Sequence, residues 1–174
     1  MQVGMPKVYL AGPGVFRPDA KAFGLALKDK CARVGLQGCF PLDNDVTGRT
    51  PAKTAAAIFR TNVALIDASR AILADISPFR GPNMDPGTAW EIGYGVAKGL
   101  PIYAWSTDPA DLFTRTERKV GARDPSQRGY DVDGWSIENF GLAENLMIVL
   151  SAMFVHGTAE QAIEACAEGL RRSA

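Results

Sequence analysis

The stretch RAILADISPFRGPNMDPGTAWEIGYGVAKGLPIYAWS (70–106) contains a strand, a helix and a second strand in succession. RAILADIS (70–77) and PIYAWS (101–106) are short apolar runs of the kind that form buried strands. Between them, DPGTAWEIGYGVAKG (85–99) opens with Asp-Pro-Gly and closes on a glycine, as helices commonly do. Two strands joined through a helix form a parallel pair. We therefore expect this stretch to lie at the centre of a parallel sheet.

The same alternation continues on both sides of this unit. The patterns predict, in chain order, strand 7–12, helix 19–35, strand 36–43, helix 51–69, helix 141–153, a weak fifth strand 154–157 and helix 158–172. Strands that alternate with helices indicate an α/β domain whose parallel sheet is covered on both faces. We predict one domain over residues 1–174, with a doubly wound, five-stranded, flavodoxin-like (Rossmann-like) sheet.

One segment, residues 107–140, breaks the alternation. It is polar, mixed in charge and punctuated by glycines. Connections of this length are uncommon unless they act as lids or are disordered. We expect a partly mobile flap over the site, and the alternative is a surface excursion without a role.

Composition and charge exclude several classes of protein. The chain has 19 Lys and Arg against 19 Asp and Glu, so its formal net charge is zero and no nucleic-acid partner is expected. It contains no apolar run of the roughly 20 residues that a membrane-spanning helix needs, and its N-terminus does not resemble a signal peptide. We expect a cytoplasmic protein without a membrane partner.

Motifs for metals and nucleotide cofactors are also missing. The three cysteines are widely spaced and the chain has one histidine, which does not favour a metal site. The Gly-Pro-Gly turn at 12–14 has Arg17 where a dinucleotide-binding fingerprint needs its third glycine. No GxxxxGK[ST] phosphate loop is present. The chemistry is therefore expected to come from carboxylates and hydroxyls.

Three carboxylates, Asp75, Asp85 and Glu91, fall within 17 residues. In a doubly wound sheet the ligand binds beyond the carboxyl ends of the strands, where the strand order reverses. A flavodoxin-like order places Tyr9 and Asp75 near Glu91 at that point. Acids that converge there repel one another unless a positive or proton-sharing group is bound. The oxocarbenium-like transition state of glycosyl transfer is such a group, so a glycosyl-transfer site is one interpretation.

Each residue also has a structural interpretation, which is individually the more probable one. Glu91 fits a solvated helix position, and Asp85 before Pro86 fits a helix N-cap. Asp75 fits a turn cap at a strand end, and Tyr9 fits an ordinary core position. Only their joint placement favours a catalytic site.

Three motifs together resemble a known family. YLAGP (9–13), ADISPFRGPNMDPGTAWEIGYGVAKGLPI (74–102) and ENLM (144–147) are similar to the nucleoside 2-deoxyribosyltransferases. The resemblance implies exchange of the base of a 2'-deoxyribonucleoside for a free purine or pyrimidine base. It implies a two-step retaining mechanism through a deoxyribosyl-enzyme ester, without metal or cofactor.

The resemblance also implies a role for each carboxylate. Glu91 would be the nucleophile that attacks the anomeric carbon, and Tyr9 would hold and tune it. Asp75 would be the acid that faces the nucleobase and passes on a proton. Asp85 would bind a sugar hydroxyl, the 5'-OH.

Further substrate contacts follow from the same resemblance. Asn145 and Met147 match an Asn-x-Met pair that the family donates from a neighbouring subunit, so a homo-oligomer built from dimers is expected, as a tetramer or hexamer in the family's manner. Phe16, just past the first strand, is a candidate to stack on the base, with an ordinary core position as the alternative. Gly12 is expected to contact the substrate.

Two rival functions remain open from the sequence. A related enzyme with the same nucleophile would hydrolyse the glycosidic bond of nucleoside 5'-monophosphates, although Asp85 would then face a dianionic phosphate at an unfavourable free energy. A nucleotide-sensing binding module on the same fold would need no nucleophile. Slow hydrolysis of deoxynucleosides is expected as a side reaction of base exchange.

Overall fold

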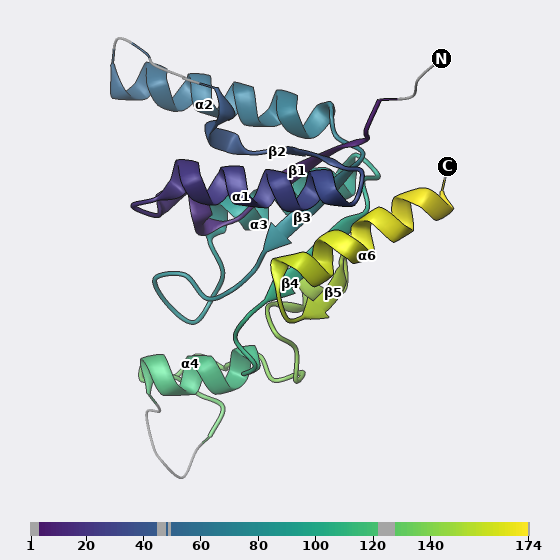
Figure 1. The fold of residues 1–174 in the computed structure, drawn as a ribbon. Coiled ribbons are helices and arrows are strands. Elements are labelled where there is room, and N and C mark those ends of the chain that lie inside the picture. Colours follow the sequence, from purple (N-terminus) through teal and green to yellow (C-terminus); the bar gives the residue numbers. More distant parts are fainter. Residues whose placement is uncertain (1–3, 45–47, 49, 122–127, 174) are drawn as a thin grey trace.

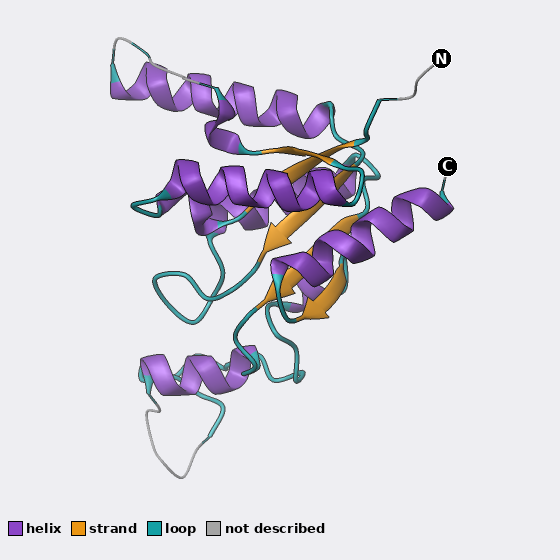
Figure 2. Ribbon diagram, in the orientation of Figure 1, coloured by secondary structure: helices purple, strands orange, loops and turns teal. Residues whose placement is uncertain are grey.

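The computed structural model describes residues 4–44, 48, 50–121 and 128–173. Within this part of the chain, five parallel strands form one sheet in the order β2-β1-β3-β4-β5 (Figures 1 and 2). The strands are β1 (Lys7–Ala11), β2 (Gln37–Cys39), β3 (Ala71–Asp75), β4 (Ile102–Ser106) and β5 (Met153–His156). The predicted doubly wound, flavodoxin-like sheet is confirmed.

Helices cover both faces of this sheet. They are α1 (Ala20–Arg33), α2 (Pro51–Asp67), α3 (Pro86–Ala97), α4 (Leu112–Val120), α5 (Leu146–Val149) and α6 (Ala159–Arg172), with 3-10 turns η1 (Pro13–Phe16) and η2 (Pro41–Asp43). Helices α1 and α6 pack on one face, while α2 and α3 pack on the other (Figure 1). Helix α4 lies apart from the sheet, on the side toward which the strand arrows point (Figure 2).

The alternation of side chains along β1 divides the core into two layers. Val8 and Leu10 belong to the apolar layer beneath α1 and α6. Tyr9 and Ala11 point to the opposite layer, beneath α2 and α3. Successive side chains of a strand face opposite sides of a sheet. Tyr9 is therefore directed toward the helix that carries Glu91.

Some predicted elements differ from the structure. The prediction of a helix over residues 141–153 is wrong. Only Leu146–Val149 is helical, and Met153 already pairs with Tyr103 in the sheet. Strand 36–43 ends at Cys39, after which Pro41 opens η2. The segment 107–140 contains α4, which the pattern did not predict, and its residues 122–127 lie outside the described part.

The strand order reverses between β1 and β3, which lie side by side in the sheet. The chain leaves β1 through η1 toward α1 on one face, and leaves β3 toward α3 on the other. A crevice for ligands opens at such a point. Of the helices in the described residues, none is both long and apolar enough to span a bilayer.

Candidate active site

Helix α3 begins at the carboxyl edge of the sheet, where Asp85 is its N-cap. Oδ2 of Asp85 accepts hydrogen bonds from the backbone N of Thr88 at 2.8 Å and from the Thr88 hydroxyl at 2.9 Å. Pro86 occupies the first turn, where a missing N–H costs nothing. Asp85 is buried, and it also lines the cavity that contains Glu91. The capping interpretation is thus confirmed, and the same side chain faces a candidate ligand site.

Glu91 lies one helical turn beyond Thr88 and contacts the first strand. The hydroxyl of Tyr9, which is fully buried, donates a hydrogen bond of 2.5 Å to Oε1 of Glu91. Burial raises the pKa of Glu91, the Tyr9 hydrogen bond lowers it and the charge of Asp85 raises it, so that the pKa is about 7. Burial, followed by the charge and hydrogen bond of Glu91, raises the pKa of Tyr9, so the phenol stays protonated. The expected neighbourhood of Tyr9 and Glu91 is confirmed.

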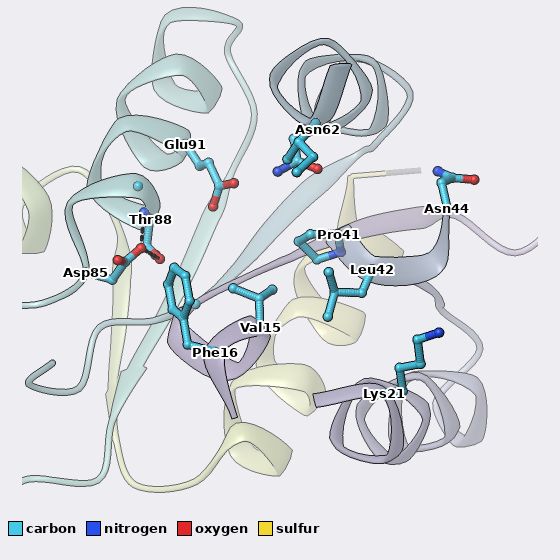
Figure 3. A pocket seen from close by; sticks show the side chains of 13 residues that line it. Val15, Phe16, Lys21, Pro41, Leu42, Asn44, Asn62, Asp85, Thr88 and Glu91 are labelled. Atoms are coloured by element: carbon cyan, nitrogen blue, oxygen red, sulfur yellow. Dashed lines mark hydrogen bonds between the residues drawn. The ribbon is translucent and has the colours of Figure 1, made fainter. Parts of the chain in front are cut away.

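The cavity in front of Glu91 has a volume of about 410 Å³. It lies between α2 and α3 and is closed below by η1 and η2 (Figure 3). Its lining residues are Gly12, Val15, Phe16, Lys21, Pro41, Leu42, Asn44, Ile58, Asn62, Asp85, Gly87, Thr88 and Glu91. Apolar walls with a few polar groups are typical of small-molecule sites.

Asn62, on α2, is a polar lining residue that the sequence analysis missed. It projects into the cavity from the helix opposite Glu91 (Figure 3). Its Oδ1 is the buried side-chain oxygen that lacks a hydrogen-bond partner among the described residues. A buried amide without a partner is costly, so a ligand is a natural partner for it. The available signal was a carboxamide four residues after Ile58, which lines the same cavity, and four before the buried Ile66.

Asp75 ends β3, and its carboxylate lines a different cavity of about 420 Å³. Its Oδ1 accepts a hydrogen bond of 3.0 Å from the backbone N of Ser77. Burial raises the pKa of Asp75, and the Ser77 hydrogen bond lowers it. Phe16 lines both cavities. The acid and Glu91 therefore lie at the same sheet edge but in adjoining spaces.

Gly12 allows the turn after β1 to pass close to Asp75. A Cβ at Gly12 would lie 2.8 Å from Cβ of Asp75, which is too close, and its φ of 148° also favours glycine. Phe16 is half-exposed and stacks on Phe79, with ring centroids 5.3 Å apart. The guanidinium of Arg80 lies 5.1 Å from the Phe16 centroid. Gly12 and Phe16 both line the Glu91 cavity.

Comparison with known proteins places the chain in a family. The family model for nucleoside 2-deoxyribosyltransferase matches residues 8–147, which include every motif residue discussed above. The chain belongs to the nucleoside 2-deoxyribosyltransferase family. A solved structure described as a 2-desoxiribosyltransferase from Leishmania mexicana is 34% identical, with a TM-score of 0.76, over 94% of this chain and 97% of that one.

Two further proteins are similar to this nucleoside 2-deoxyribosyltransferase family member, one in sequence and one in fold. An uncharacterised protein of Schizosaccharomyces pombe is 34% identical over 160 residues, which cover 82% of this chain and 75% of that protein. A 2-deoxyribosyltransferase of Bacillus psychrosaccharolyticus shares the fold, with a TM-score of 0.57 and 18% identity over 91% of this chain and 90% of its own.

Asn145 and Met147, the expected neighbour-subunit pair, do not line the Glu91 cavity of their own chain. Asn145 caps α5: its Oδ1 accepts from the backbone N of Met147 at 3.0 Å, and its Nδ2 donates to Glu138 at 2.8 Å. The side chain of Met147 is exposed, with 72% of its surface accessible. In this nucleoside 2-deoxyribosyltransferase family member, both residues thus lie on the surface of the single chain.

Proposed function

We propose that the protein exchanges the base of 2'-deoxyribonucleosides through a covalent deoxyribosyl ester on Glu91. The observation that carries the proposal is the Tyr9–Glu91 hydrogen bond beside a cavity that also contains Asp85. A carboxylate that is largely withdrawn from water and held by a phenol is a suitable nucleophile for an anomeric carbon. The family and the Leishmania mexicana structure support the same reaction.

In the first step, a Glu91 oxygen attacks C1' while the bond from C1' to the base nitrogen breaks. The bonding electron pair leaves with the base, which takes up a proton. In the second step, a nitrogen of the incoming base attacks C1', the ester bond breaks, and the incoming base passes its proton to the group that protonated the first base. Glu91 returns to a carboxylate. Water in place of the second base gives slow hydrolysis.

Asp75 is the proposed source of the proton. Burial raises the pKa of its carboxyl, which favours the protonated form that an acid needs. The base reaches Asp75 by extending past Phe16, which lines both cavities. Asn62 has no proton to transfer, and we assign to its carboxamide, whose Oδ1 lacks a partner among the described residues, the binding of the ring edge of the base.

Asp85 is proposed to bind the 5'-hydroxyl of the sugar. Its Oδ2 is engaged by Thr88, and the carboxylate lies in the same cavity as Glu91. A carboxylate accepts a hydrogen bond from a hydroxyl but repels a phosphate. This charge favours free nucleosides over nucleoside 5'-monophosphates.

The active unit is proposed to be at least a dimer. Asn145 and Met147 lie outside their own cavity. Met147 on α5 and Leu150, the C-cap that follows this helix, expose 72% and 74% of their surfaces. By resemblance, Asn145 completes the sugar site of a neighbouring subunit, and Met147 lines its pocket.

The deciding experiment follows the fate of the base by chromatography. The protein is incubated with 2'-deoxyadenosine and free hypoxanthine and, separately, with 2'-deoxyadenosine 5'-monophosphate. The proposal expects 2'-deoxyinosine from the first mixture and little adenine from the second. Release of adenine from the monophosphate without exchange would support the hydrolase instead. Binding of nucleosides with neither reaction would support a sensing module.

A further inference from the structure

Arg115 is a buried arginine on α4 whose guanidinium contacts three separate segments. Its Nε donates to the carbonyl of Pro82 at 2.9 Å, and its Nη1 to the carbonyl of Ala110 at 2.6 Å. Its Nη2 donates to the carbonyl of Ala143 at 2.6 Å and to Oε2 of Glu144 at 3.1 Å. All three nitrogens are thus used, which requires the planar fork of an arginine.

Glu144 completes the contact from the other side. Its Oε2 also accepts from the backbone N of Met84 at 3.0 Å, and its Oε1 accepts from the backbone N of Asn145 at 3.1 Å. The side chains of Arg115 and Glu144 expose only 5% and 3% of their surfaces. The ion pair is therefore enclosed, and its hydrogen bonds are to backbone groups at fixed positions.

Two of these backbone groups lie just before Asp85 in the chain. Pro82 and Met84, which the ion pair holds, lie three residues and one residue before Asp85 in the connection from β3 to α3. The same carboxylate holds the backbone of Asn145 at the start of α5. The ion pair thus holds the backbone that leads to Asp85, which lines the cavity. It also holds the backbone of Asn145, which lies on the surface.

We propose that Arg115 and Glu144 are positioning residues that set the place of Asp85 and so determine recognition of the substrate's 5'-hydroxyl. The inference rests on the proposed function of the Glu91 cavity. It gives the segment after β4 a role in specificity, since α4 supplies the guanidinium.

Stability alone is a weak reason for this arrangement. Replacing a buried ion pair by apolar residues of similar volume is often neutral or stabilising, because both charges must be removed from water. The apolar surroundings of Met84 and Ala143, both buried, would accept such residues. Apolar side chains cannot form the hydrogen bonds that Arg115 and Glu144 make with the backbone of Pro82 and Met84.

The test compares two substrates that differ only at the 5' position. Arg115→Lys keeps the charge but loses the fork, so we expect kcat/KM for base exchange with 2'-deoxyadenosine to fall by about ten-fold or more. With 2',5'-dideoxyadenosine, which lacks the hydroxyl, the loss should be less than about two-fold. In an Asp85→Ala background, Arg115→Lys should cost nothing further. Arg118→Lys, on the exposed side of α4, is the matched control.

Equal losses with both substrates, or no loss with either, would overturn the inference while leaving exchange by the wild type intact. Absence of exchange by the wild type would instead count against the proposed function. Arg115→Met/Glu144→Leu removes both charges and serves if Arg115→Lys does not fold. In this double variant too, kcat/KM should fall more with 2'-deoxyadenosine than with 2',5'-dideoxyadenosine. Equal losses with the two substrates would overturn the inference.

Discussion

The hydroxyl of Tyr9 lies 2.5 Å from Oε1 of Glu91 and joins the first strand to the third helix. The phenol stays protonated, because burial and the adjacent carboxylate raise its pKa. Burial raises the pKa of Glu91 and the Tyr9 hydrogen bond opposes this effect, which leaves the pKa at about 7. The pair thus sets the fraction of Glu91 that is ionised, and hence nucleophilic, near neutral pH.

Tyr9→Phe should therefore move the pH dependence of exchange. In the wild type, the limb of kcat/KM that rises with pH should have its midpoint near 7, as Glu91 loses its proton. Removal of the Tyr9 hydroxyl leaves burial unopposed, so the midpoint should move up by about one pH unit. The measurement is kcat/KM from pH 5 to 9. An unchanged midpoint would show that Tyr9 only supports the fold.

Glu91→Gln should abolish exchange and yet stabilise the protein above neutral pH. The pKa of Glu91 in the folded protein, about 7, lies above its ordinary value of 4.5. The free energy that the protonated group contributes is therefore complete below pH 4.5 and is lost as pH rises through 7. Gln does not ionise, so the variant should gain about 1–3 kcal/mol over the wild type at pH 8 and almost nothing at pH 4.

Two measurements check this prediction. Urea denaturation at pH 4 and pH 8 gives the free energies of unfolding, and mass spectrometry of quenched reactions detects a deoxyribosyl adduct. The adduct should appear on the wild type and not on Glu91→Gln. Glu164→Gln, at an exposed position of α6, is the control. It should form the adduct and have the same free energy of unfolding as the wild type. An adduct on Glu91→Gln would assign the nucleophile to another residue.

The sheet and the Tyr9–Glu91 contact were predictable because both follow from periodicity. Apolar strands alternating with helices indicate a doubly wound parallel sheet, and the flavodoxin-like order predicted for it brings β1 beside β3. Alternation along β1 then directs Tyr9 toward α3. These steps need only the period of a strand and the handedness of crossover connections.

Asn62, Arg115 and helix α4 were not predictable in the same way. Helix α4 buries Arg115, a residue type that a sequence pattern assigns to the surface. Its partners, including Pro82 and Glu144, are about 30 positions away in the sequence. An unpaired oxygen such as Asn62 Oδ1 is recognised only when its surroundings are known. Long-range polar contacts leave no periodic signal.

Asp75→Asn should distinguish proton transfer from binding of the base. We expect a fall of about 10²-fold or more in kcat with 2'-deoxyguanosine, whose base needs a proton to leave. The fall should be much smaller with 7-methyl-2'-deoxyguanosine, because its base carries a positive charge and leaves neutral. Single-turnover release of the base is the measurement.

Asn62→Ala supplies the contrast for this prediction. A carboxamide binds the ring but transfers no proton, so its loss should weaken the binding of both substrates to a similar extent. If Asp75→Asn also affects both substrates equally, Asp75 is not the acid. The proton would then have to come from another group or from water.

Two inactive variants should restore activity when they are mixed, if Asn145 completes a neighbour's site. In a mixed dimer of Glu91→Gln and Asn145→Ala chains, one site has an intact Glu91 from one chain and an intact Asn145 from the other. Random reassociation of equal amounts should give about a quarter of the wild-type exchange rate per chain. Glu91→Gln mixed with Asp85→Ala is the control, because both residues belong to the same chain's cavity and no intact site can form. Recovery in the first mixture and none in the second requires a shared site, whereas failure of both would show that Asn145 does not complete a neighbour's cavity.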